Sequence, residues 1–195
     1  MTNKLLLAAL TATAVLPAAA QAQRAPAAVV VVIDTDRIYR ECTACRAAVT
    51  QLQSQAQSLQ SRQQALATPL TTEGQQIQTA LNALNGRQPD QALRTRVQAF
   101  ETRRDQAAQE VDRLRQNIQS TQANVRRQID ARLEPIINQV MTGRGANIAV
   151  DTNATLAAAN GVNVTNDVLA RLNQQLPSVS VTPLPQTQQQ QTQGR

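Results

Sequence analysis

The fold is decided by residues 49–84, which read VTQLQSQAQSLQSRQQALATPLTTEGQQIQTALNAL. Apolar residues recur in this stretch three and four positions apart, so they form two adjacent rows on one face of a helix. The first row contains Val49, Ala56, Leu70, Ile77 and Leu84, and the second contains Leu52, Leu59 and Leu66. Rows sustained over several heptads are typical of a seam along which two helices pack in a coiled coil.

Residues 93–125 repeat this seam. Their rows are Val97, Val111, Ile118 and Val125 on one side and Leu93, Phe100, Ala107 and Leu114 on the other. Between the two stretches, Asn85-Gly86 can end a helix and Pro89 suits the first turn of the next one. We therefore predict two long helices, from about residue 37 to 84 and from 89 to about 141, folded back on each other as an antiparallel hairpin.

The seam is imperfect, because polar residues interrupt it at Gln63, Glu73, Arg104 and Thr121. Pro69 also lies inside the first predicted helix, where it removes a backbone donor and clashes with the preceding turn. We expect a kink or a break just before Pro69, so the hairpin should flex at this level.

The segment before the hairpin predicts a buried strand. Residues 29–33 are a continuous β-branched run, Val-Val-Val-Val-Ile. Thr35 or Asp36 is expected to cap the helix that follows, because a short side-chain oxygen can accept from the free N–H groups of its first turn.

The segment after the hairpin predicts the rest of a small globular part. A denser apolar stripe near the end of the second helix (Ile129, Leu133, Ile136, Ile137 and Val140) indicates that this helix enters a core. Residues 147–151 predict a second strand, and residues 156–159 are a candidate for a third. A last helix is expected over residues 165–176, with Thr165-Asn166-Asp167 as its cap and acidic first turn.

These elements predict an α+β fold that is mostly α. A small β-sheet body (residues 27–42 and 141–176) carries a helical arm (residues 43–140), and residues 23–176 form a single domain. From residue 177 the chain consists mainly of Pro, Ser, Thr and Gln. A tail of residues 177–195 with so little apolar content is expected to be disordered.

The N-terminus predicts export. Lys4 precedes an apolar run over residues 5–16, and Ala20-Gln21-Ala22 is a small-residue cleavage site, so residues 1–22 are expected to be a signal peptide. A retained anchor is the alternative, but the run is short for a membrane-spanning helix. We expect an exported protein that is soluble in the periplasm.

Removal of residues 1–22 leaves no lysine. The 19 Lys and Arg residues less Lys4 give 18 Arg against 13 Asp and Glu, a net charge of +5. A basic surface can attract nucleic acid, anionic lipid or acidic protein, and outside the cytoplasm we expect no nucleic-acid partner. The candidate contact residues for acidic protein or lipid phosphate lie near the predicted turn: Arg87, Arg94, Arg96, Arg103 and Arg104. The alternative is that these side chains only solvate the helix.

The composition also argues against catalysis. The chain has no His, which is the usual general base and the commonest neutral metal ligand. We expect no enzyme activity and no cofactor. Cys42-Thr43-Ala44-Cys45 is the one motif that could carry chemistry. In an oxidising compartment it is most simply a local disulfide, and the alternatives are a cross-subunit link, a redox-active pair or a metal site pooled between subunits.

This layout resembles the Skp/OmpH family of periplasmic chaperones. The resemblance rests on residues 29–34 followed by a helix, the Gln-rich hairpin, residues 147–154 (Asn-Ile-Ala-Val-Asp-Thr-Asn-Ala) and residues 164–169 (Val-Thr-Asn-Asp-Val-Leu). The Cys42–Cys45 pair departs from the usual family pattern. The resemblance covers nearly all of the chain after the predicted signal peptide.

The resemblance implies a homotrimer whose joined β bodies extend three arms. It implies ATP-independent holding of unfolded outer-membrane proteins between those arms. The basic charge, rather than the resemblance, makes anionic lipid or lipopolysaccharide a further candidate ligand. No client-binding residue can be carried over from a family motif. An envelope coiled-coil adaptor and a thiol oxidoreductase remain as alternative functions.

Overall fold

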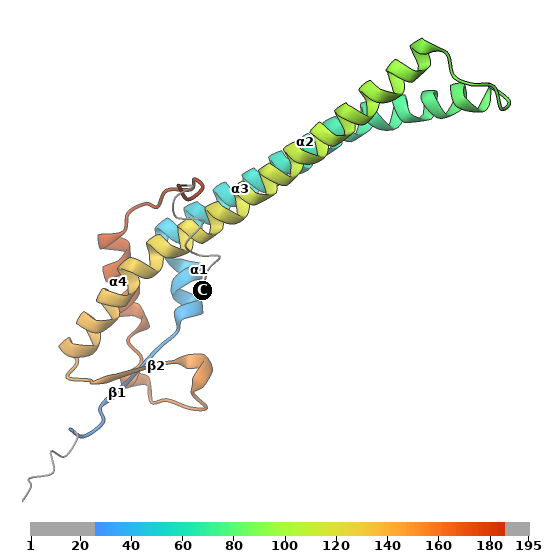
Figure 1. The fold of residues 1–195 in the computed structure, drawn as a ribbon. Helices are drawn as coiled ribbons and strands as arrows, with labels where there is room; N and C mark the ends of the chain where they lie inside the picture. The colour runs from blue at the N-terminus through green and yellow to red at the C-terminus, as the bar shows by residue number, and fades with distance from the viewer. Residues whose placement is uncertain (1–25, 186–195) are drawn as a thin grey trace, which may run out of the picture.

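The computed structural model describes residues 26–185. The expected signal peptide and residues 186–195 of the expected tail lie outside this range. The elements are β1 (Val30–Ile33), α1 (Thr35–Glu41), α2 (Thr43–Asn82), α3 (Gln91–Gly143), β2 (Ile148–Asp151), the 3-10 turns η1 (Thr152–Ala154) and η2 (Asn160–Val162), and α4 (Thr165–Gln175). The long helices α2 and α3 lie side by side and project from the end that holds the other elements (Figure 1).

The sheet consists of two parallel strands. β1 pairs with β2 in a register that places Val30 opposite Ile148 and Ile33 opposite Asp151. The predicted third strand over residues 156–159 is wrong. The other edge of β1 is occupied by Asn163, which forms a parallel bridge with Val32, while Leu156 is fully exposed. The segment therefore lacks both a ladder partner and a buried face.

One hydrophobic core unites the two ends of the chain. Its members come from β1, α1, α4 and the adjoining ends of the long helices, and they include Ile33, Ile38, Ala44, Ala48, Ile129, Leu133, Ile136, Val140, Val168 and Leu172. The stripe that begins at Ile129 enters the core as predicted. The core also extends past the predicted body boundaries at residues 42 and 141. We call β1, β2, α1, α4 and residues 43–48 and 125–143 the packed end, and residues 49–124 the distal arm.

The predicted single helix from residue 37 is two helices. At Cys42 the backbone is extended (φ −62°, ψ 137°), which ends α1 and caps α2. The N-cap of α1 is Asp34, whose Oδ1 accepts from Arg37 N at 2.7 Å, so the predicted caps are wrong. The Thr35 hydroxyl instead donates to Asp151 and ties α1 to the end of β2.

The cap of α4 also differs from the prediction. Thr165 is fully buried, and its hydroxyl accepts from Asp34 N at 2.9 Å. The N-cap position is Val164, which offers no side-chain cap, while Asn163 Oδ1 accepts from Thr165 N at 3.0 Å. Residues 34 and 165 are thus joined within the core.

The predicted break near Pro69 is absent, because α2 continues through this residue. Leu66 and Leu70, on either side of Pro69, are both half-buried. Packing on both sides of the proline favours one continuous helix despite the lost backbone donor. After α2, Asn85 and Gly86 have φ values of 47° and 86°. These left-handed residues end the helical region at the positions predicted from the sequence.

The distal arm has little interior. Of its predicted seam residues, Ile77 alone is buried, Val49 and Ala56 are exposed, and the rest are half-buried. Two helices in contact leave each seam residue one open side. Polar pairs join the helices as well: Arg62 bonds Glu110 at 2.7 Å, and Arg103 bonds Glu73 at 2.5 Å.

Residues 177–185, which we call the strap, run back from α4 along α3 towards the distal arm (Figure 1). The expectation that the chain lacks packing from residue 177 is wrong for the strap. Val179 and Val181 are half-buried against the core, and Leu184 is buried at 9% exposure. Apolar residues separated by polar ones give this segment a face that the helices cover.

Candidate functional site

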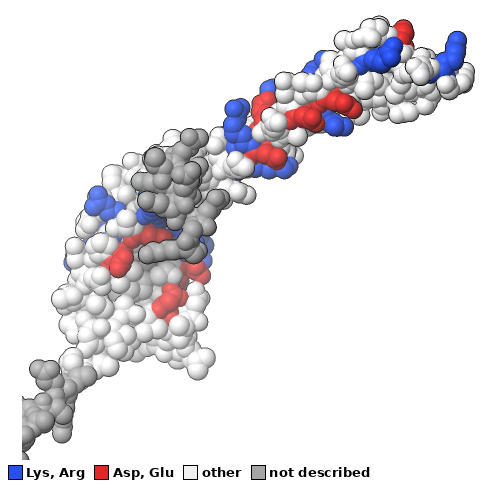
Figure 2. Space-filling view, in the orientation of Figure 1, with Lys and Arg blue, Asp and Glu red and all other residues white. Residues whose placement is uncertain are grey.

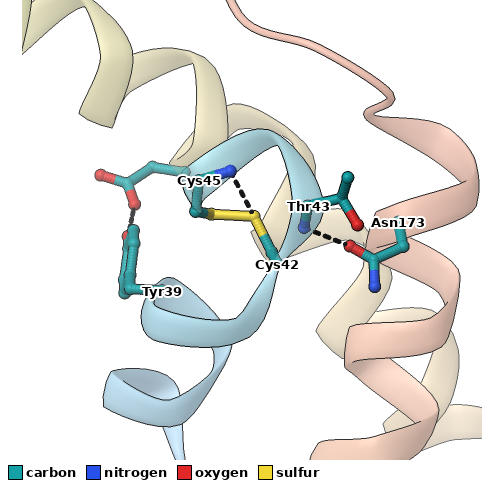
Figure 3. The surroundings of a disulfide bond; sticks show 6 residues. Tyr39, Cys42, Thr43, Cys45 and Asn173 are labelled. Atoms are coloured by element: carbon teal, nitrogen blue, oxygen red, sulfur yellow. Dashed lines mark hydrogen bonds between the residues drawn. A yellow bond between two sulfur atoms is a disulfide. The ribbon is translucent and has the colours of Figure 1, made fainter. Parts of the chain in front are cut away.

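The motif most suggestive of chemistry is a closed disulfide. Cys42 and Cys45 are bonded to each other at the junction of α1 and α2 (Figure 3). Cys42 Sγ accepts from Cys45 N at 3.0 Å, and Asn173 Oδ1 of α4 accepts from Thr43 N at 2.8 Å. These two acceptors satisfy free N–H groups in the first turn of α2, so the junction is tied to α4.

Burial argues against redox chemistry at this pair. Cys42 is 1% exposed and Cys45 is 3% exposed. Thiol–disulfide exchange needs access of an attacking thiolate to a sulfur atom. With both sulfurs paired within the chain, neither is left for a link between subunits.

A polar cluster beside the disulfide joins α1 to α3. The Tyr39 hydroxyl donates to Asp130 (Figure 3), and the Arg126 guanidinium lies 5.7 Å from the centre of the Tyr39 ring. Burial, followed by the bond to Asp130, raises the pKa of Tyr39 to about 12. The phenol therefore stays protonated and serves as a donor that fixes the two helices.

The arginines near the turn are largely engaged within the chain. Arg96 and Arg103 both face Glu73, at 3.8 and 2.5 Å, and Arg104 lies 3.5 Å from Asp105. Arg87 Nε donates to the Leu84 carbonyl at 3.3 Å. Of these five arginines, Arg94 alone has no side-chain hydrogen bond or ion pair within residues 26–185.

The surface charge of the distal arm is accordingly mixed. Figure 2 shows blue and red side chains interspersed along the distal arm on the side in view. The structure thus brings Arg96 and Arg103 to one carboxylate, and acidic side chains lie among the basic ones of the distal arm on this side.

An apolar groove lies between α2 and α3 where the strap ends. It has a volume of ≈ 500 Å³ and is lined by Ser54, Gln55, Ser58, Leu59, Arg62, Glu110, Leu114, Asn117, Ile118, Thr121 and Pro183. Leu59, Leu114 and Ile118 are half-buried. We call this space the strap groove. Apolar residues among polar neighbours suit it to hold the side chains of another polypeptide segment.

The seam pattern identifies the apolar residues of the strap groove, but sequence reasoning missed the groove itself and the strap beside it. The available signal was the spacing of Val179, Val181 and Leu184 among Ser, Thr and Pro.

Across residues 26–185 there is no group of three or more His, Cys, Asp or Glu side chains that could hold a metal ion. In the same residues no helix is sufficiently long and apolar to cross a membrane.

A family model matches most of the chain. The family model for outer membrane protein (OmpH-like) matches residues 29–172. Among curated proteins none matches the chain significantly. The structure is similar to the crystal structure of a candidate outer membrane chaperone (OmpH-like) from Caulobacter crescentus CB15, with a TM-score of 0.67 and 18% sequence identity. That match covers 86% of this chain and 98% of the other, and at this identity it shows a shared fold.

Proposed function

The chain belongs to the OmpH-like outer membrane protein family, and from this premise we propose that it is a periplasmic holdase chaperone. It binds unfolded outer-membrane proteins, its clients, without ATP and prevents their aggregation. The predicted signal peptide supports export to the periplasm, and a buried disulfide suits an oxidising compartment.

The observation that carries this proposal is the half-covered seam of the distal arm. Leu59, Leu114 and Ile118 keep part of their apolar surface accessible between polar neighbours. Each 100 Å² of apolar surface removed from water contributes about 2.5 kcal/mol. Many small contacts along two long helices can therefore hold an unfolded chain without one dominant pocket.

We further propose that three copies join through the packed end. Apolar side chains are exposed around the sheet, with Val29 at 46%, Val30 at 40% and Ile148 at 42% exposure. Leu156 nearby is fully exposed. Burial of these residues between copies would leave the distal arms free to surround a client.

The arginines near the turn are proposed as secondary contacts. Arg87, Arg94 and Arg104 could meet acidic client segments, anionic lipid or lipopolysaccharide, because each presents a guanidinium near the end of the distal arm. Arg96 and Arg103 would first have to leave Glu73.

The test is an aggregation assay with the protein that begins near Gln23. A urea-unfolded porin is diluted into buffer without nucleotide, and light scattering is followed. We expect equimolar trimer to suppress scattering. Undiminished scattering at several-fold excess would contradict the holdase, whereas a stable folded partner without affinity for unfolded chains would favour the envelope adaptor.

The disulfide supplies a second test of the mechanism. The double variant Cys42→Ser, Cys45→Ser should protect the porin as well as the wild type does at a temperature where it remains folded. A thiol oxidoreductase would instead lose its activity completely.

A further inference from the structure

The strap is held by its backbone. Gln55 Nε2 donates to the Val181 carbonyl at 3.1 Å, Asn124 Nδ2 to the Thr182 carbonyl at 3.0 Å, and Gln128 Nε2 to the Ser180 carbonyl at 2.9 Å. In the other direction, Ser180 N donates to Gln128 Oε1 and Leu184 N donates to Ser120 Oγ, both at 2.9 Å. All five bonds join a side chain of α2 or α3 to a main-chain group of the strap.

The partners form an ordered row on α3. Ser120, Asn124 and Gln128 are four residues apart and therefore lie on one face of the helix. Gln128 both donates to and accepts from Ser180, which is the pair of bonds that a neighbouring β-strand offers to a residue. Because these bonds are made to main-chain groups, the same side chains could bind an extended segment of almost any sequence.

The apolar side chains of the strap add packing to these hydrogen bonds. Val179 and Val181 are two residues apart and half-buried, and Leu184 is buried. Ser180 and Thr182 between them are exposed, with their hydroxyls 2.8 Å apart. The alternation of apolar and polar residues over positions 179–182 is also the pattern of a transmembrane β-strand from an outer-membrane barrel.

The strap groove adjoins the strap and extends beside apolar residues of both long helices. The strap groove includes Pro183 in its lining and continues beside Leu59, Leu114 and Ile118. An extended segment bound on this face could therefore also make apolar contacts in the groove. The strap itself lies past residues 29–172, the part of the chain that the family model matches.

We propose that the strap is a built-in competitor that occupies a client site. The face formed by Gln55, Ser120, Asn124, Gln128 and the strap groove binds extended, unfolded β-barrel strands with alternating apolar residues, and a client must displace the strap to bind fully. This inference rests on the proposed holdase function and names the chemistry of its ligand.

Tethering makes the strap an effective competitor despite its few contacts. A segment joined to the protein by a short linker experiences an effective concentration in the millimolar range. The apparent affinity for a client is reduced by the fraction of molecules in which the face is closed. Release of the strap should therefore tighten client binding, by roughly tenfold if about nine molecules in ten are closed.

The experiment measures binding of a fluorescent ten-residue peptide with the alternating pattern of a barrel strand, by anisotropy, to the chain that begins near Gln23. Leu184→Asp places a charge in a buried position and should release the strap, so the peptide should bind roughly tenfold more tightly. Ser178→Asp is the matched control, because Ser178 is an exposed strap residue, and it should leave the affinity unchanged. Asn124→Ala combined with Gln128→Ala should weaken binding even when the strap is released.

A second measurement uses the wild-type protein, so its outcome does not depend on whether a variant folds. Excess free peptide LPSVSVTPLP, the sequence of residues 176–185, should compete with the fluorescent peptide for the wild-type protein. Unchanged peptide affinity in Leu184→Asp, or the absence of competition, would overturn the proposal of a strap-covered client site. If either negative result is obtained while the protein still suppresses porin aggregation, the holdase function stands. If neither the wild type nor any variant suppresses porin aggregation, the holdase function itself is overturned.

Discussion

The packed end and the distal arm share the long helices α2 and α3 but use them in opposite ways. At the packed end, Ile38, Ile136 and Leu172 are completely buried. In the distal arm, Ile77 at 6% exposure is the single buried apolar side chain of residues 49–124. One part of each helix therefore supplies the stability of a core, and the other part keeps apolar surface available for contacts.

The comparison is most strongly tested by shortening one buried side chain in each region. Ile136→Ala should lower the free energy of unfolding by about 2–5 kcal/mol, because it leaves a cavity in a closed core. Ile77→Ala is the control and should cost clearly less, since the two helices of the distal arm can close around a smaller residue. Urea denaturation followed by circular dichroism measures both, and equal losses would contradict the contrast.

Reduction of the disulfide should have the second-largest effect on stability, and the effect should be confined to the packed end. The disulfide closes a loop with a sequence separation of 3. The chain-entropy relation gives such a short loop roughly 2 kcal/mol. Reduction should lower the midpoint of thermal unfolding, while hydrogen exchange of the distal arm stays unchanged. Faster exchange across residues 49–124 would show that the distal arm depends on the junction.

Gly74 offers a smaller effect confined to the distal arm. A Cβ added there would lie 3.3 Å from Cζ of Phe100, which crosses from α3. Gly74→Val should therefore force the helices apart and destabilise the distal arm by about 1–2 kcal/mol. Gly143→Val is the matched control, because nothing lies within 4 Å of its added Cβ. Hydrogen exchange around residues 66–107 distinguishes the two.

Two carboxylates give the smallest and most selective test. The bond from the Thr35 hydroxyl lowers the pKa of Asp151 at the packed end, and the bond from Arg62 lowers the pKa of Glu110 in the distal arm. A pKa below the unfolded value means stability that is present above about pH 4 and lost as pH falls through the folded value. Both Asp151→Asn and Glu110→Gln should flatten the acid limb of the stability curve.

High salt should reduce the contribution of Glu110 to stability more than that of Asp151. Glu110 pairs with an exposed guanidinium, and 1 M NaCl screens such a pair strongly. Asp151 accepts from a hydroxyl and from main-chain N–H groups, so its contribution should resist salt. Acid titrations at low and high salt measure the difference. Equal salt sensitivity would argue against the assignment of these partners.

The hairpin was predictable because its cause is local. Leu52, Leu59 and Leu66 repeat every seven residues, and Asn85-Gly86 marks the turn, so the pattern alone specifies two helices in contact. Both strands and the entry of Ile129 into the core followed from similarly dense apolar runs. These features depend on the local sequence pattern and little on contacts with residues distant in the sequence.

The remaining features depend on distant partners. The helix break falls at Cys42, where Asn173 from α4 supports the new N-terminus, and α2 continues at Pro69, where α3 packs alongside. The strap has too few apolar residues to predict order, and side chains such as Asn124 and Gln128, which hold it, lie more than 50 positions away in the sequence. The arginines near the turn were visible in sequence, but their pairing with Glu73 required the fold.

Hydrogen exchange of the assembled protein, with and without a saturating unfolded porin, tests the central claim most directly. The account predicts slower exchange in the distal arm, little change in the core around Ile136 and Leu172, and faster exchange in the strap as the client displaces it. Protection confined to the packed end, with an unchanged distal arm and strap, would contradict the account.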